Sequence, residues 1–164
     1  ILMTIANKRS ALLLNTGNKT ETALGYCTMY GDMAGGFSVL KDIPKTLVYE
    51  LSYWRNAESG DREIIPANIL NKPPSAELKP DQRDDDDLPS YELLDQVLEA
   101  YVENDRSFEE MKSLGFDSSI VKRVMKAVDR SEYKRRQSPI GIKITPRAFG
   151  RDRRMPIVNA YQGF

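Results

Sequence analysis

A hydroxyl, a cation and a carboxylate follow an apolar run near the start of the chain. The run covers residues 12–14, all leucine, and the polar side chains belong to Thr16, Lys19 and Glu21. A continuous apolar run that is bounded by glycine is typical of a buried strand in a parallel sheet. Ligands bind at the carboxyl ends of such strands, because loops and helix N-termini converge there. The three side chains therefore predict a site for a phosphate ligand with a bound metal.

The chain has no histidine among its 164 residues, which limits the chemistry available to it. Catalysis by Ser-His-Asp or Cys-His groups is excluded, and so is the commonest ligand of transition metals. Carboxylates, lysines and a hard cation such as Mg²⁺ remain. The one cysteine, Cys27, cannot form an internal disulfide, which indicates a reducing, cytoplasmic compartment. We interpret Cys27 as a small core residue and not as a nucleophile.

Length and charge narrow the class of protein further. The chain is long enough for one domain with a hydrophobic core, and no apolar run approaches the roughly 20 residues of a membrane span. Residues 77–110 hold thirteen acidic and three basic side chains, whereas residues 130–164 hold nine basic and two acidic ones. The basic end would attract polyanions such as phosphates. The acidic half would repel a duplex, so we expect no nucleic-acid partner.

The first half of the chain contains the elements that must position the polar side chains. A strand over residues 10–15 leads into a short helix over 20–28, and a glycine-rich loop follows at 30–37. Glycine in such a loop permits close backbone approach to a ligand. Pro44 opens the next helix, because the first turn does not need the N–H group that proline lacks. That helix should end at residues 59–61.

The second half predicts helices that pack together. Apolar stripes at helical spacing cover residues 93–102 and 120–128. Between them, Ser107 and Glu110 fit a capping box for a short helix that ends at Gly115. Each buried Leu, Ile or Val contributes about 1.5–3 kcal/mol. We therefore assign these helices to the core and expect no chemistry from them.

The remaining segments are short or irregular. Residues 1–8 indicate the last part of a helix, and residues 64–71 a helical turn. Residues 72–78 should be extended, because a residue that precedes proline avoids the α region. Residues 79–87 include four consecutive aspartates and should form a mobile loop, either a lid over an active site or a solvated linker. The basic, irregular tail at 138–164 should lie on a surface or reach a partner.

Five ordered motifs give the chain a close resemblance to a known family. The motifs are NTGNKTE from Asn15, GYCTMYGD from Gly25, IPKT from Ile43, KPPSAEL from Lys72 and EYKRRQ from Glu132. With them, residues 1–164 resemble the C-terminal half of the ATP-dependent synthetase domain of glutamine-dependent NAD synthetases, in the ATP pyrophosphatase group. The resemblance implies an α/β fold, the C-terminal part of a Rossmann-like domain with a parallel sheet, mostly helical in this fragment.

The resemblance also implies a reaction, its substrates and its partners. In this family the carboxylate of deamido-NAD attacks the α-phosphate of ATP, which gives an adenylated intermediate and pyrophosphate. Ammonia then displaces AMP to give NAD, and a separate amidase domain makes that ammonia from glutamine. The synthetase domains are homo-oligomers, and Mg²⁺ is the implied cofactor. Adenylation needs charge neutralisation on phosphate, which Mg²⁺ and lysine supply without histidine.

The resemblance carries ATP-binding and catalytic roles onto four residues of this chain. Thr16, Lys45 and Ser75 match residues that contact ATP, with Lys45 on the phosphates. Glu21 matches a carboxylate at the Mg²⁺ and deamido-NAD site, so Glu21 and Lys45 are the expected catalytic residues. Three of them have a simpler interpretation alone: Glu21 as a first-turn acid that stabilises its own helix, Lys45 as a solvated lysine and Ser75 as a turn residue. The joint spacing of the motifs favours the ligand roles.

Three more residues match the deamido-NAD site. Lys134 corresponds to a lysine of that site, Tyr133 lies beside it, and Asp32 falls in the glycine-rich loop near the nicotinate end. The simpler interpretation of residues 134–136 is a solvated helix end.

The sequence contains neither the family's pyrophosphate loop nor an amidase domain with its nucleophilic cysteine. We therefore expect a fragment that is inactive alone and whose parent makes NAD. A hypothesis from a different class is that the chain is a non-catalytic binding or oligomerisation module.

Overall fold

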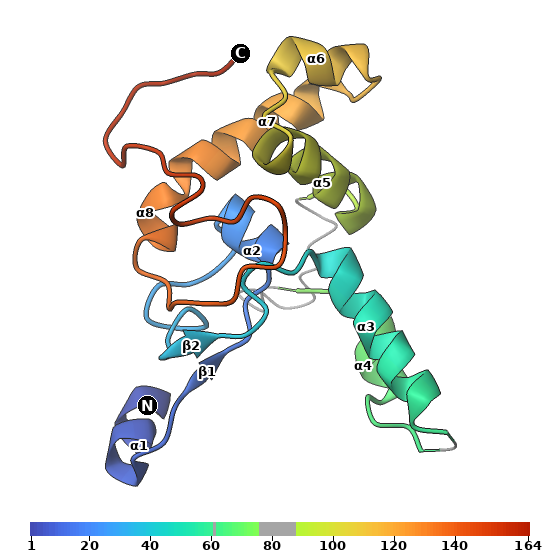
Figure 1. The fold of residues 1–164 in the computed structure, drawn as a ribbon, viewed down its shortest axis with the longest axis vertical. Helices are drawn as coiled ribbons and strands as arrows, with labels where there is room; N and C mark the ends of the chain where they lie inside the picture. The colour runs from blue at the N-terminus through green and yellow to red at the C-terminus, as the bar shows by residue number, and fades with distance from the viewer. Residues whose placement is uncertain (61, 76–87) are drawn as a thin grey trace.

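The structure is a computed structural model that describes residues 1–60, 62–75 and 88–164 (Figure 1). The acidic loop expected at 79–87 lies outside the described residues. In chain order the elements are α1 (Leu2–Arg9), β1 (Leu14–Asn15), α2 (Lys19–Leu24), β2 (Phe37–Ser38), α3 (Lys45–Glu58), α4 (Ala67–Asn71), α5 (Tyr91–Leu98), the π-helical turn η2 (Glu99–Glu103), α6 (Phe108–Ser113), α7 (Ser118–Arg130) and α8 (Glu132–Arg135). None of the helices in these ranges has both the length and the apolar character needed to cross a bilayer.

A short parallel sheet supports the predicted α/β class. β1 pairs with β2, with Leu14 opposite Phe37 and Asn15 opposite Ser38. The predicted strand over residues 10–15 is too long, because only its last two residues pair. Leu14 is half exposed, at 51% of its surface, since no second layer in the described part of the chain covers it. The apolar run thus predicted a strand correctly but overestimated its length and burial.

Helix α2 is shorter than the predicted range of 20–28. It ends at Leu24, and Gly25 follows with a positive φ of 73°. A Cβ atom at this glycine would lie 2.2 Å from Oγ of Ser131, so the chain turns where α2 meets the start of α8. Cys27 therefore lies beyond the end of α2, although the expected range of the helix included it.

The core forms where α5, η2, α6 and α7 meet α2, as predicted from the apolar stripes. The side chains with at most 2% of their surface exposed include Leu94, Val97, Val102, Met111, Val121, Val124, Met125 and Val128. Ser107 and Glu110 form the predicted capping box at the start of α6. The π-helical turn η2 buries Ala100, Tyr101 and Val102 on the same core. Local periodicity therefore predicted the packing of this half.

Helices α1, α3 and α4 project away from this core (Figure 1). The helix predicted after Pro44 is confirmed over Lys45–Glu58, yet none of its residues is buried. Leu51 and Trp54 are exposed, although they share a helical face. Ile5 of α1 is exposed as well. The described part of the chain therefore leaves apolar surface on these helices uncovered.

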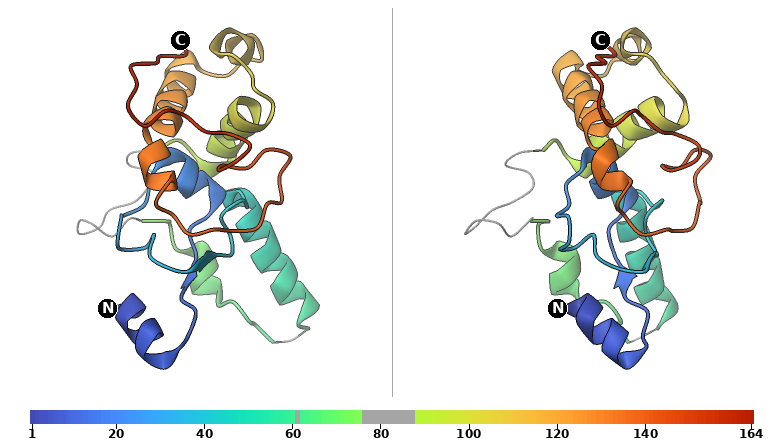
Figure 2. Two further views of the ribbon diagram at one scale, coloured as in Figure 1. Left: turned by 60° about the vertical axis from the view of Figure 1, so that its left-hand side comes forward. Right: turned by 90° about the vertical axis from the view of Figure 1, so that its left-hand side faces the viewer.

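The basic tail at 138–164 contains no helix, as expected, and crosses the surface beside α8 and α2 (Figure 2). It is fixed there by specific contacts. The backbone N–H of Thr145 donates to Asp42 Oδ2 at 2.8 Å. The Arg153 guanidinium stacks 4.2 Å from the ring centre of Tyr101. The tail is thus part of the folded unit.

The central position of α5 can be tested with Leu94, which is fully buried. We expect Leu94→Ala to lower the free energy of unfolding by about 2–5 kcal/mol, because truncation removes apolar contacts and leaves a cavity. Leu114→Ala, at an exposed position after α6, should change it by less than about 0.5 kcal/mol. Chemical denaturation followed by circular dichroism measures both, and equally small losses would contradict the assigned core.

Candidate functional site

Glu21 makes two kinds of contact at the start of α2. Its Oε2 accepts from the backbone N–H of Asn18 at 3.2 Å, and the Asn18 side chain accepts from the N–H of Glu21 at 2.9 Å. This capping box satisfies N–H groups that a helix start leaves unpaired. The other oxygen, Oε1, forms an ion pair with Lys45 Nζ at 3.1 Å. Glu21 therefore stabilises its own helix and also presents charge to Lys45.

Lys45 is the first residue of α3 and its ammonium group is partly shielded from water. The Nζ atom lies 5.4 Å from the ring centre of Tyr91 and 5.8 Å from that of Tyr49. Aromatic rings attract a cation at such distances, and reduced contact with water strengthens its other electrostatic interactions. A helix N-terminus favours negative charge. The ammonium and the start of α3 together therefore favour an anion beside them.

Asp95 of α5 holds the starts of α2 and α3 next to each other. Thr20 Oγ1 donates to Asp95 and accepts from the backbone N–H of Lys45 at 2.9 Å. Asp95 Oδ2 accepts from the N–H and the hydroxyl of Thr46, at 2.9 and 2.8 Å. Asp95 thus caps α3, whose N-cap residue is a proline without a side-chain hydrogen bond. No sequence pattern predicts this role, because the residues involved lie far apart in the sequence.

Lys19 does not face a ligand site, contrary to the expectation that it would complete a phosphate site with Thr16 and Glu21. Its side chain is 3% exposed, and Nζ forms ion pairs with Asp42 at 3.1 Å and with Glu103 at 2.8 Å. The same atom donates to the backbone carbonyl of Arg147 in the tail. A buried ammonium is stable only when it is paired and hydrogen-bonded, as it is here. Lys19 is therefore a structural cation that joins α2 to the tail.

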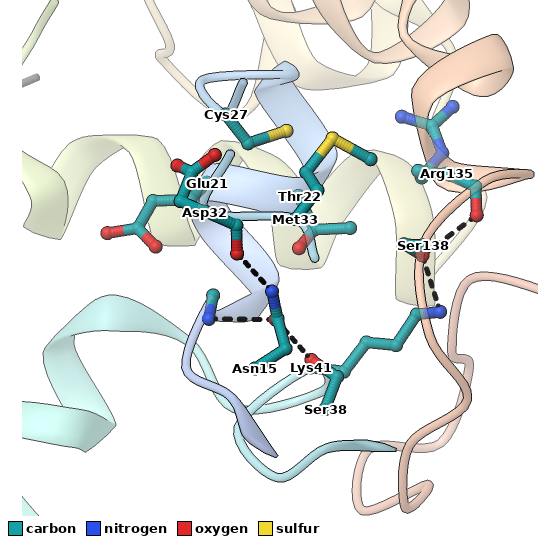
Figure 3. Close-up of a pocket in the computed structure, with 11 residues that line it drawn as sticks. Asn15, Glu21, Thr22, Cys27, Asp32, Met33, Ser38, Lys41, Arg135 and Ser138 are labelled. Carbon is teal, nitrogen blue, oxygen red and sulfur yellow. Dashed lines mark hydrogen bonds between the residues drawn. The ribbon is translucent and has the colours of Figure 1, made fainter. Parts of the chain in front are cut away.

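Glu21 and Asp32 line one small cavity between β1, α2 and the start of the tail (Figure 3). Its lining consists of Asn15, Gly17, Glu21, Thr22, Cys27, Asp32, Met33, Ser38, Lys41, Arg135 and Ser138. The free space of about 20 Å³ has room for a water molecule, not for a nucleotide. Lys41 Nζ donates to Ser138 Oγ at 2.7 Å and so closes one wall. A larger ligand would therefore contact Glu21 and Asp32 from outside this cavity.

The other candidate residues lie around this cluster. Thr16 is exposed between β1 and α2, and Ser75 is half-buried after α4. Tyr133 is partly exposed on α8. Lys134 Nζ donates to the backbone carbonyls of Gly25 and Cys27, at 2.6 and 2.7 Å. The structure thus brings Glu21, Lys45 and Asp32 near the start of α2, whereas Lys134 secures the segment that follows that helix.

Cys27 is half-buried and has no disulfide partner. Burial raises the pKa of its thiol, because a thiolate would lose contact with water, and the nearby carboxylates of Asp32 and Glu21 raise it further. The ammonium of Lys134 opposes these effects but is outweighed by burial. The thiol is therefore protonated at neutral pH. Cys27 lies outside the cluster of buried core residues, so the expectation of a core position was wrong.

The described residues offer little to hold a metal by themselves. Within residues 1–60, 62–75 and 88–164, no three or more Cys, Asp or Glu side chains form a group that could hold a metal ion. Mg²⁺ usually keeps several waters and binds through one or two carboxylates together with substrate phosphates. The Glu21 carboxylate could be the one protein ligand in a site where Mg²⁺ binds together with a phosphate ligand.

Comparison with known proteins identifies relatives along nearly the whole chain. The sequence model described as NAD synthase matches residues 1–138. The glutamine-dependent NAD(+) synthetase of Acinetobacter baylyi is 53% identical over 162 residues, which cover 99% of this chain and 30% of that protein. That of Thermotoga maritima is 52% identical, over 98% of this chain and 28% of its own length. The structure of NMN synthetase from Francisella tularensis matches with a TM-score of 0.63 and 27% identity, over 82% of this chain and 48% of that one. The chain thus spans less than a third of the length of the two curated NAD(+) synthetases.

The state of the Cys27 thiol can be tested by alkylation with iodoacetamide. Because only the thiolate reacts and the pKa is raised, we expect slow labelling at pH 7. The rate should still rise at pH values where labelling of an ordinary thiol, with a pKa of about 8.5, levels off. Mass spectrometry over a pH series measures the rate, and the urea-unfolded chain gives the unshielded reference. Cys27→Ser should not be labelled. Equal rates for folded and unfolded protein at pH 7 would contradict the assigned environment.

Proposed function

Because this chain belongs to the NAD synthase family, we propose that it is part of a glutamine-dependent enzyme that amidates deamido-NAD to NAD. The observation that supports this function most directly is the identity of about half the residues, along nearly the whole chain, with glutamine-dependent NAD(+) synthetases. The chain spans about 30% of those relatives, so the activity is proposed for a longer protein that contains it. The chain alone is proposed to be inactive, because the pyrophosphate loop of the family is not in its sequence.

The proposed reaction has two steps. The carboxylate oxygen of deamido-NAD forms a bond to the α-phosphorus of ATP, and the bond from that phosphorus to pyrophosphate breaks. Ammonia, made from glutamine in a separate amidase domain, then attacks the acyl carbon and displaces AMP, which leaves the amide of NAD. Mg²⁺, when bound with ATP, would neutralise charge on the phosphates.

Lys45 and Glu21 are the residues that we propose act on the reacting groups. Lys45 would bind the ATP phosphates at the start of α3, where its partly desolvated ammonium and the helix N-terminus both favour an anion. Glu21 would orient that ammonium through the 3.1 Å ion pair and would share the Mg²⁺ that ATP carries. The Asp95 contacts support these roles, because they fix α2 and α3 relative to each other before a ligand arrives.

The remaining proposed contacts divide between the two substrates. Thr16 and Ser75 would contact ATP. Asp32, Tyr133 and Lys134 would contact deamido-NAD, and Lys134 would also shape its site through the carbonyls of the segment after α2. We place the reaction in the cytoplasm and propose that the parent protein is a homo-oligomer.

A second candidate function is a non-catalytic binding or oligomerisation module. The exposed apolar side chains of α1 and α3, including Leu51 and Trp54, favour it. Calorimetry of the chain with ATP and Mg²⁺ separates the two functions. Saturable binding that Lys45→Ala abolishes would support a nucleotide site, whereas no binding together with concentration-dependent self-association would support the module.

The role of Glu21 can be tested without losing its helix cap. We expect Glu21→Gln in the full-length protein to reduce NAD formation from deamido-NAD, ATP, Mg²⁺ and ammonia by about 100-fold or more, because the negative charge is lost. The capping box accepts Gln in place of Glu, so the thermal stability should change little. A steady-state assay and a melting curve measure the two effects.

Glu110→Gln is the matched control. Glu110 makes the same capping box at α6 and an ion pair of the same 3.1 Å length, with Arg106, on the opposite side of the core from α3. The Glu110→Gln variant should therefore form NAD at the wild-type rate. If the two Gln variants were equally active, the proposed role of Glu21 in the reaction would be rejected.

The role of Lys45 is tested by truncation. Lys45→Ala in the full-length protein should lower turnover by about two orders of magnitude, because the phosphate charge loses its partner. Lys112→Ala removes an exposed lysine of α6 and should leave turnover unchanged. A Lys45→Ala enzyme with near-normal rates and normal melting would reject the assigned role.

A further inference from the structure

We infer that Asn15 is a positioning residue, one that fixes the loop that carries Asp32 against the end of β1 and so sets the affinity for the deamidated dinucleotide. The inference rests on the proposed function, in which Asp32 contacts deamido-NAD. Asn15 itself, at the end of β1, makes no direct ligand contact in the proposed function.

The Asn15 amide uses both of its ends to join three segments of chain. Its Oδ1 accepts from the backbone N–H of Gly17 at 3.1 Å and from the hydroxyl of Ser38 at 2.8 Å. Its Nδ2 donates to the backbone carbonyl of Asp32. Asn15 is 6% exposed, so these hydrogen bonds form away from bulk water. Loss of one of them would leave a buried polar group unpaired, which destabilises the folded state. One side chain thus connects the start of α2, strand β2 and the Asp32 loop.

This connection is one of the contacts that fix the position of the loop. Its internal hydrogen bonds, such as Ala34 N–H to the Gly31 carbonyl at 2.9 Å and Thr28 N–H to Asp32 Oδ1 at 2.5 Å, fix its shape but not its place relative to β1. Tyr30 in this loop is 87% exposed, whereas Met33, directly after Asp32, is buried, so packing holds the loop on only one side of Asp32. The Asn15 bond attaches the loop to the strand at Asp32 itself.

Two glycines bring the loop close enough for that bond. The Gly36 N–H donates to the Leu13 carbonyl at 2.8 Å. Gly35 has a φ of 155°, and a Cβ atom there would lie 3.1 Å from that carbonyl and 3.2 Å from Cβ of Asn15. The backbone therefore approaches β1 at a distance that a larger residue would disturb. The close approach and the Asn15 amide together fix where the Asp32 carboxylate stands.

The chemistry at this position requires an amide. An aspartate in place of Asn15 would keep the acceptor for Gly17 and Ser38 but would turn a carboxylate oxygen toward the Asp32 carbonyl, and two acceptors repel. Protonation of that carboxyl at low pH would restore a donor. Asn15→Asp is therefore nearly isosteric yet breaks the one bond on which the inference depends.

The experiment uses steady-state kinetics of the full-length protein with ammonia as nitrogen source. We expect Asn15→Ala and Asn15→Asp to raise KM for deamido-NAD about tenfold, the effect of one lost buried hydrogen bond, and to leave KM for ATP within about twofold. The defect of Asn15→Asp relative to the wild type should shrink as the pH falls. Because Asn15 acts through Asp32, the effects of Asn15→Ala and Asp32→Ala on KM should be far from additive in a double-mutant cycle.

Asn56→Ala is the matched control for a loss of structure. The Asn56 amide makes the same pattern, accepting from the N–H groups of Ile64 and Ile65 and donating to the Ile65 carbonyl at 2.8 Å, but at the far end of α3. It should lower the melting temperature to a similar degree without changing either KM. A rise in both KM values in Asn15→Ala, or additive effects with Asp32→Ala, would overturn the inference.

These outcomes separate the inference from the function on which it rests. If Asp32→Ala raises KM for deamido-NAD and Asn15→Ala does not, the positioning role fails and the proposed function stands. If the wild-type protein forms no NAD, or if Asp32→Ala changes nothing, the proposed function or its Asp32 contact fails first.

Discussion

The contacts of Asp95 are the constraint on which the arrangement of the candidate site depends. This carboxylate, on the core helix α5, accepts hydrogen bonds from the Thr20 hydroxyl and from the backbone N–H and hydroxyl of Thr46 in the first turn of α3. It therefore places two helix starts side by side, and with them Glu21 and Lys45. α5 is packed in the apolar core, and through Asp95 it positions the helix starts that carry the Glu21–Lys45 ion pair. A disturbance in the packing of α5 would thus reach the proposed phosphate-binding residues through one side chain.

The sequence predicted best what depends on neighbouring residues. The stripes of α5 and α7 and the capping box of α6 each extend over a few helical turns, so their physical cause is contained in the segment itself. The parallel pairing of β1 was also predicted, but not its length, because strand length depends on partners that are distant in sequence. Burial of a strand is likewise set by what covers it, and a run of leucines does not contain that information.

Within the site, the sequence predicted which residues lie there better than it predicted which partners they contact. Lys19 was expected to face a phosphate, yet it pairs with Glu103, a residue 84 positions away. Lys134 binds carbonyls of a segment more than a hundred positions earlier in the chain. No local pattern reveals such pairings, since they follow from how η2, the tail and α8 pack against α2 and the segment after it. The proposed roles of Thr16 and Ser75 rest on the spacing of their motifs.

The π-helical turn η2 connects the apolar core to a buried ion pair. A π turn holds one more residue than an α turn. η2 buries Ala100, Tyr101 and Val102 in the core and ends at Glu103, whose carboxylate pairs with the ammonium of Lys19. A one-residue change in the length of η2 would therefore disturb the core packing and the ion pair together, whereas a substitution at Glu99, which is exposed, would leave both in place.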